Sequence, residues 1–191
     1  MNCDFCYLKC FLKEGQIGVC GVRKNIDGKM KAIEEFNEKN GYMVVFSCNT
    51  CPFVIGGDAF DGWEKDYNNL YERAKSVGVG MVLINSNEAK RNEGDGLKNM
   101  KDRAKEYKYE MDYLLDANHK LADAFGAKTT PHVFIFDHNH KLIYKGAIDN
   151  SWNPKAKQID HYVINALGSM VSGGSIEKNE TAPKGCSIKR L

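Results

Sequence analysis

The residues of this 191-residue chain that are best placed to do chemistry are two cysteines, Cys48 and Cys51. Two thiols separated by two residues can close into a disulfide with little backbone movement, because the short loop fixes the distance between them. The strand predicted before the pair and the helix predicted after it favour reversible thiol–disulfide exchange. A structural pair and half of a zinc site share the same spacing and are the alternatives.

The order of the two cysteines predicts their roles. A thiol at the first turn of a helix is stabilised as a thiolate, because unpaired backbone N–H groups point at it. We therefore expect a helix that begins at the pair, with Cys48 at its N-terminal end as the nucleophile that attacks a substrate disulfide. Cys51, deeper in the helix, is then expected to resolve the mixed disulfide.

Five further cysteines lie outside this pair. Cys3, Cys6, Cys10 and Cys20 supply four soft ligands within eighteen residues, a set that suits zinc or an iron–sulfur cluster. The alternative is a reduced, cysteine-rich segment that binds no metal. Cys186 lies in a polar tail, where we expect a free surface cysteine; a third thiol that reaches back to the pair is the alternative.

The composition predicts one soluble main domain without a large charged surface. Lys and Arg number 27 and Asp and Glu number 25, a formal net charge of +2, and the charges are interspersed. The sequence has no apolar run of about 18 residues and no signal-peptide pattern. We therefore expect a cytoplasmic protein that binds neither nucleic acid nor a membrane.

Short apolar, β-branched runs alternate with helical periodicity from residue 42 onward. The runs predict strands at residues 42–46, 79–84, 132–136 and 142–144, the last two as a hairpin. Apolar residues three or four apart predict helices over residues 63–74, 97–107 and 121–125.

The boundaries of some of these elements can also be predicted. We expect Asp116 or Asn118 to cap the short helix and Gly126 to end it. Asn153-Pro154 is expected to open a last helix that buries Ile159. Residues 85–96, rich in Asn, Glu and Gly, are expected to form a surface loop.

This order of elements describes an α/β protein with a mixed central sheet flanked by helices. We expect three parts: a cysteine-rich N-terminal appendage over residues 1–24, a main domain over residues 25–172, and a polar, irregular C-terminal tail over residues 173–191.

Several segments together resemble the thioredoxin-like redoxin family, which is related to alkyl hydroperoxide reductase and thiol-specific antioxidant proteins. They are residues 25–30, 46–52, 83–85, 113–116, 124–127, 129–134, 146–149 and 185–189. The resemblance implies a thioredoxin fold in which Pro131 is the cis-proline that faces the redox pair. It also implies that the Thr130 backbone beside this proline binds an extended substrate segment.

A shorter resemblance concerns the N-terminal segment. Residues 1–28, mainly from Cys6 onward, are similar to the N-terminal stretch of radical S-adenosylmethionine activating-enzyme-like proteins. The cluster motif and the barrel of such an enzyme are absent from the sequence, so radical chemistry is not expected.

Redoxins carry out two chemistries, and the residues before Cys48 help to choose between them. Peroxiredoxins resemble one another in a Pro-x-x-x-Thr-x-x-Cys segment, but residues 41–47 contain neither the proline nor the threonine. The sequence therefore predicts a thiol–disulfide oxidoreductase that acts on protein or small-molecule disulfides. A thiol peroxidase, and a metal-binding or interaction module on the same scaffold, are the alternatives.

Such an enzyme needs a substrate and a source of electrons. We expect a disulfide-containing protein or a small thiol as the substrate, and a thioredoxin or glutathione system as the reducing partner. Disulfide exchange itself requires no cofactor.

Overall fold

The computed structural model describes residues 23–25, 30–31, 33–174 and 176–191 of the chain. The strands are β1 (Arg23–Asn25), β2 (Met30–Lys31), β3 (Gly41–Ser47), β4 (Val79–Asn85), β5 (Asp112–Leu115), β6 (Thr129–Thr130), β7 (His132–Asp137), β8 (Leu142–Gly146) and β9 (Cys186–Ser187). The α-helices are α1 (Pro52–Ile55), α2 (Tyr67–Ser76), α3 (Leu97–Glu106), α4 (Lys120–Phe125) and α5 (Tyr162–Ser172). Short 3₁₀ turns cover Ile33–Phe36, Glu64–Asp66, Glu88–Lys90 and Ala117–His119.

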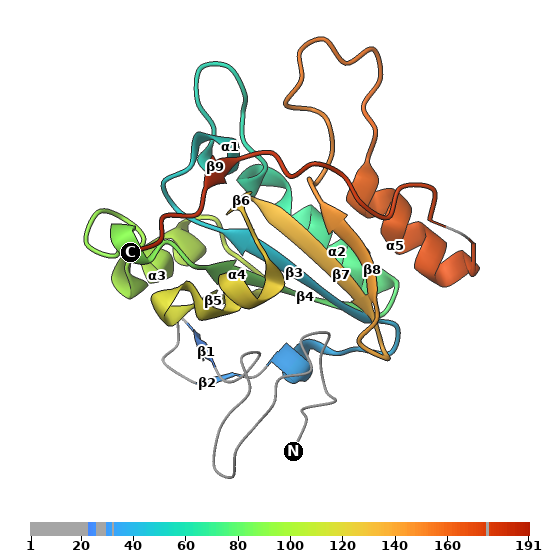
Figure 1. The fold of residues 1–191 in the computed structure, drawn as a ribbon, viewed down its shortest axis with the longest axis horizontal. Helices are drawn as coiled ribbons and strands as arrows, with labels where there is room; N and C mark the ends of the chain where they lie inside the picture. The colour runs from blue at the N-terminus through green and yellow to red at the C-terminus, as the bar shows by residue number, and fades with distance from the viewer. Residues whose placement is uncertain (1–22, 26–29, 32, 175) are drawn as a thin grey trace.

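The described strands form a seven-stranded mixed sheet in the order β2-β1-β5-β4-β3-β7-β8, and β6 pairs with β9 in a separate ribbon (Figure 1). Strands β3, β4 and β5 run parallel, whereas β7 and β8 form the predicted antiparallel hairpin. Every residue of the central strand β3 is buried, as expected for a strand that is covered on both faces. The predicted α/β class and mixed sheet are confirmed.

Alternate residues of the strands point into two apolar layers. On one face, Met43 and Val45 of β3 pack with buried residues of α2 and α5. On the other face, Val44 and Phe46 pack with Leu121 and other residues of α4. This two-residue period is the geometry of a pleated strand, so the apolar run of β3 supplies both layers at once.

Three helices agree well with the sequence patterns. Helix α3 matches its predicted range to within one residue. Helix α2 overlaps most of its predicted range, but it begins at Tyr67, so Trp63 precedes it. The Asp116 carboxylate accepts the backbone N–H groups of Leu121 and Ala122 at 3.0 Å, which confirms it as the cap of α4. Gly126 ends α4 with a φ of 66°, as predicted.

Other expectations are wrong. Helix α5 begins at Tyr162 and not at Asn153-Pro154, and Ile159 lies before it with 44% of its surface exposed. Strand β5 was not predicted, because its four residues are too few for a clear period. The tail is not wholly irregular, since it contains β9. Among the described residues, no helix combines the length and the apolar character needed to cross a membrane.

A buried ion pair joins the 3₁₀ turn before α2 to helix α3. The Glu64 side chain, 1% exposed, accepts the Arg103 Nε–H at 2.7 Å and is also bonded to the Tyr109 hydroxyl. Removal of Glu64 leaves a guanidinium and a phenol without their common acceptor.

We predict that Glu64→Ala lowers the free energy of unfolding by about 3 kcal/mol, because a partly buried charge loses its partner. Urea unfolding at pH 7 measures the change. Lys98→Ala, which breaks the exposed pair with Asp102, is the control and should leave the free energy of unfolding nearly unchanged. Equal effects of the two substitutions would contradict the prediction.

Candidate redox site

The two central cysteines flank a short loop between β3 and α1. Cys48 directly follows β3, and Cys51 is the N-cap residue of α1, whose first residue is Pro52. The expectation that Cys48 lies at the N-terminus of the helix and Cys51 inside it is therefore wrong. The helix begins at Pro52 and not at Cys48. Cys51 therefore has the position at the helix N-terminus that was expected for Cys48.

Both thiols are buried and connected by hydrogen bonds. Cys48 is 1% exposed and Cys51 is 2% exposed. The Cys186 backbone N–H donates to the Cys51 sulfur at 3.3 Å. The protonated Cys51 thiol donates to the Thr130 carbonyl oxygen at 3.0 Å.

These contacts separate the acidities of the two thiols. The hydrogen bond from Cys48 is the largest cause that lowers the pKa of Cys51, to about 5, and the bonds from Cys186 and Phe53 act in the same direction. The pKa of Cys48 is raised by its bond to Cys51, by burial and by the negative charge of Asp95. These two directions favour Cys51 over Cys48 as the thiolate of the pair.

Thr130 and Pro131 lie against the pair, as the resemblance implies. The Thr130–Pro131 peptide bond is cis, so this expectation is confirmed. The Thr130 hydroxyl lies 3.1 Å from the Cys48 sulfur, and Thr130 is fully buried. The Thr130 backbone pairs with Cys186 of the chain's own β9, which occupies the edge expected to receive a substrate segment.

A buried carboxylate holds the loop between the cysteines. Asp95 is fully buried, and each of its oxygens accepts two hydrogen bonds. The Asn49 N–H and the Thr50 hydroxyl donate from the redox loop at 2.7 and 2.8 Å. Asn85 and Asn87 donate their side-chain amides at 2.8 and 3.0 Å. Asp95 thus ties the redox loop to the end of β4.

Arg91 completes this network from the outside. Its guanidinium donates to the Asn85 side chain and backbone, to the carbonyl oxygens of Asp95 and Asp116, and to Glu88. All five N–H donors of Arg91 are therefore used within the protein.

Sequence reasoning missed this network because residues 85–96 resemble a surface loop in composition. Asn85, Asn87 and Asp95 are instead at most 2% exposed. One signal was present: Asn85 ends β4 as Ser47 ends β3, and the two residues are paired in the parallel sheet. Polar residues at neighbouring strand ends meet at one edge of the sheet, next to the cysteine pair.

A comparison with protein families identifies the group to which the chain belongs. The Redoxin family model matches residues 22–162, which is most of the chain. The chain belongs to the Redoxin family. No curated protein matches the sequence of this redoxin.

Solved structures with the same fold agree with this assignment. An uncharacterized conserved protein from Geobacillus kaustophilus is 29% identical, with a TM-score of 0.80 over 90% of this chain and 88% of that one. A hypothetical protein from Sinorhizobium meliloti is 25% identical, with a TM-score of 0.78 over 93% and 97%. A secreted Mycobacterium tuberculosis disulfide oxidoreductase is 15% identical, with a TM-score of 0.53 over 81% and 96%, and shows the fold alone.

The four cysteines predicted as metal ligands, Cys3, Cys6, Cys10 and Cys20, lie outside the described residues. The zinc or iron–sulfur site therefore stays a prediction, as does the resemblance over residues 1–28. Within the part of the chain that the structure describes, no group of three or more His, Cys, Asp or Glu side chains is arranged to hold a metal ion.

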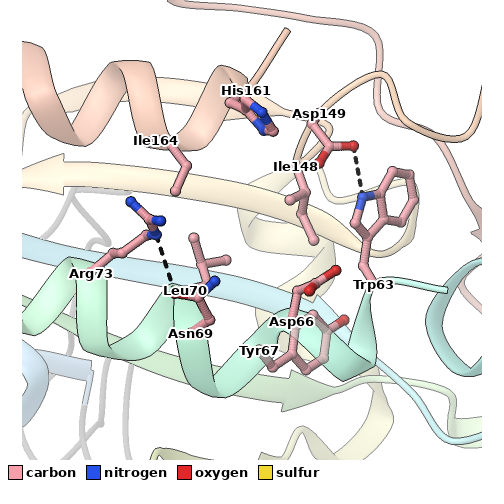
Figure 2. Close-up of a pocket in the computed structure, with 10 residues that line it drawn as sticks. All are labelled: Trp63, Asp66, Tyr67, Asn69, Leu70, Arg73, Ile148, Asp149, His161 and Ile164. Atoms are coloured by element: carbon pink, nitrogen blue, oxygen red, sulfur yellow. Dashed lines mark hydrogen bonds between the residues drawn. The ribbon is translucent and has the colours of Figure 1, made fainter. Parts of the chain in front are cut away.

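A pocket of about 250 Å³ lies between α2 and the segment that leads into α5 (Figure 2). In its wall, the Trp63 indole donates to Asp149 at 2.9 Å. Tyr67, which also lines it, shares a hydrogen bond of 2.9 Å with the Ser47 hydroxyl next to Cys48. None of the three described cysteines lines the pocket, so it is not where the thiols act.

We predict that Asp95→Asn lowers the free energy of unfolding by about 2 kcal/mol, because an amide nitrogen cannot accept two of the four hydrogen bonds. The substitution also lowers the pKa of Cys48, since it removes a nearby negative charge. Urea unfolding and the pH dependence of Cys48 alkylation, followed by peptide mass spectrometry, measure the two effects. Asp102→Asn on the exposed face of α3 is the control and should change neither.

His132, beside Pro131, generates a pH prediction. It is 4% exposed, and burial, with the charges of Lys128 and Lys145, lowers its pKa from 6.5 to about 4. The unfolded chain therefore binds a proton at His132 more readily than the folded chain does. The contribution of His132 to stability is fully present above pH 6.5 and is lost as the pH falls toward 4. The loss reaches about 3 kcal/mol, from roughly 1.4 kcal/mol per pKa unit.

His132→Asn keeps an acceptor for the Lys128 N–H, which lies 3.2 Å from the His132 Nδ1. Urea unfolding at pH 7 and at pH 4 should show a smaller loss of stability for this variant than for the wild type. A pH dependence identical in the two proteins would rule out His132 as its source.

Proposed function

We propose that this redoxin is a thiol–disulfide oxidoreductase in which Cys51 is the nucleophile and Cys48 a resolving thiol. The observation that carries the proposal is the hydrogen bond of 3.3 Å from the Cys186 backbone N–H to the Cys51 sulfur. Hydrogen bonding to this sulfur, first from Cys48, also lowers the pKa of Cys51 to about 5. Such bonds stabilise a thiolate, which is the reactive form of cysteine. The pair expected from the sequence is kept, and the roles of its members are exchanged.

The proposed reaction proceeds in two exchanges. The Cys51 thiolate attacks one sulfur of a substrate disulfide; the substrate S–S bond breaks, a Cys51–substrate disulfide forms, and the departing sulfur takes up a proton. Cys48 then loses its proton and attacks the Cys51 sulfur, which releases the second substrate thiol and leaves a Cys48–Cys51 disulfide. The substrate gains two electrons from the protein pair and two protons, one from the Cys48 thiol and one from the solvent, because Cys51 enters the reaction as a thiolate.

The surroundings of the pair favour disulfides over peroxides as substrates. A thiol peroxidase needs a cation and free donors to stabilise the leaving oxygen. Arg91 donates to the backbone of Asp95, the residue that holds the redox loop, and all five of its N–H donors are bonded to protein groups. The Thr130 hydroxyl contacts Cys48 and not the Cys51 sulfur.

The electrons for the next cycle must come from outside the protein. We propose a dithiol protein of the thioredoxin type, or glutathione, as the reductant, and a protein or small-molecule disulfide as the substrate. Because Cys51 lies beneath the two-residue strand β9, a bulky substrate reaches it when β9 separates from β6. Short peripheral strands open at low free-energy cost compared with the core.

Insulin reduction in the presence of dithiothreitol tests the proposal. We predict that Cys51→Ser reduces the rate at least about 100-fold, as expected when the nucleophile is removed. Ser76→Ala, at the exposed end of α2, is the control and should keep the wild-type rate. Hydrogen peroxide consumption is measured with the same samples.

Two results would contradict the proposal. Wild-type activity in Cys51→Ser would exclude Cys51 as the nucleophile. Rapid turnover of peroxide by a wild-type protein that does not reduce insulin would favour the peroxidase alternative.

A further inference from the structure

The C-terminal segment of the chain contains strand β9, which lies beside β6 (Figure 1). Strand β9 pairs with β6 so that Cys186 lies opposite Thr130. Gly185 approaches Thr130 so closely that a Cβ on it would lie 2.1 Å from the Thr130 carbonyl oxygen. This close approach requires glycine and brings the next residue, Cys186, against the pair.

Residues after β9 hold the segment in place. The Ile188 side chain is 4% exposed and packs in the apolar layer beneath α4. The Lys189 N–H donates to the Asn87 side chain at 2.9 Å, and Arg190 donates to Asp123 at 2.7 Å. These contacts hold the segment in the fold. Cys186 is a free cysteine, as expected, but it is partly buried in a strand and does not lie in an irregular tail.

Cys186 lies against the Cys51 thiol. Its backbone N–H donates to the Cys51 sulfur at 3.3 Å. The Cys186 side chain also lowers the pKa of Cys51, after the larger effect of Cys48. Cys48 and Cys51 are buried, whereas Cys186 is partly exposed. Of the three described cysteines, Cys186 is the one that a partner protein can reach.

We propose that Cys186 is a third redox-active thiol, which forms a disulfide with Cys51 and exposes that disulfide to an external dithiol reductant. This inference rests on the proposed function of Cys51 as the nucleophile. It makes Cys186 a second resolving thiol, next to Cys48.

The proposed steps balance in atoms and electrons. After Cys51 has formed a mixed disulfide with the substrate, Cys186 loses its proton and attacks the Cys51 sulfur. The Cys51–substrate bond breaks, the substrate thiol leaves with a proton, and a Cys51–Cys186 disulfide forms. A thiolate of the external dithiol then attacks the exposed Cys186 sulfur and releases Cys51. The second thiol of the reductant frees Cys186, and the reductant leaves as a disulfide.

The acidity of Cys51 fits its role as the group released in the reduction step. The hydrogen bond from Cys48 lowers the pKa of Cys51 to about 5, whereas burial and the bond to Cys51 raise the pKa of Cys186 to about 11. Thiols of low pKa leave faster in disulfide exchange. An external thiolate that attacks Cys186 therefore expels the better leaving group.

The test uses full-length Cys48→Ser, in which Cys51 keeps only Cys186 as a neighbouring thiol among the described residues. The protein is oxidised with diamide, its free thiols are blocked with N-ethylmaleimide, and it is digested with trypsin without reduction. We expect mass spectrometry to find residues 40–65, which contain Cys51, linked to residues 185–189, which contain Cys186. Maleimide on both cysteines would overturn the proposal.

Two further variants in the Cys48→Ser background separate chemistry from structure. Ser187→Ala, which changes the exposed neighbour of Cys186 in β9, should form the link at an unchanged rate. Gly185→Ala, which forces β9 away from Thr130, should slow it severalfold. Equal rates in the two variants would contradict the proposed dependence on the packed segment.

Turnover distinguishes this inference from the proposed function. If Cys186 resolves Cys51, Cys48→Ser keeps insulin reduction within about tenfold of the wild-type rate, and Cys48→Ser/Cys186→Ser loses it about 100-fold. A wild type that does not reduce insulin would refute the proposed function. An active wild type with equal rates in the single and double variants would refute the role of Cys186 alone.

Discussion

The redox site depends on one buried carboxylate. Asp95 has no contact with water and balances its charge with four hydrogen bonds, two of which come from the loop between the cysteines. A buried carboxylate is tolerated only when it is saturated with donors. If the loop moved away, the buried Asp95 carboxylate would lose two of its four hydrogen bonds. The carboxylate therefore holds Cys48 and Cys51 in one geometry. The same charge raises the pKa of Cys48 and keeps it protonated.

The surroundings shift the pKa values of the two neighbouring thiols in opposite directions. Hydrogen bonding between them is the largest cause that raises the pKa of Cys48 and lowers that of Cys51, and the Cys186 backbone N–H also donates to the Cys51 sulfur. Thr130 contacts both sulfurs, one through its hydroxyl and one through its carbonyl oxygen. Because Thr130 also pairs with β9, the residue that borders the pair is the residue that positions the third thiol. The site therefore joins three parts of the chain: the β3–α1 loop, the Thr130–Pro131 turn and the C-terminal segment.

The sequence predictions succeeded where an element depends on residues close together in the chain, and they failed where it depends on distant ones. Strands β3, β4 and β7 were predictable because their apolar runs are long and almost entirely buried, and β8 because a short turn joins it to β7. Asp116 and Gly126 were recognisable as cap and stop because both act on residues nearby in the chain. The start of α5 was missed because Asn153-Pro154 makes a turn in a long loop, and a local helix signal does not reveal whether packing follows it.

The sequence by itself determined the chemistry of this protein: the spacing of Cys48 and Cys51, the family to which the chain belongs and the mixed α/β architecture. Only the tertiary structure decided how the pKa values of the two thiols are shifted, since acidity depends on hydrogen bonds and charges that residues 95 and 186 bring from distant parts of the chain. It also decided that Asp95 is buried and that Cys186 contacts Cys51. Burial and long-range contact are properties of the packed molecule, and neither residue's neighbours in sequence carry a signal for them.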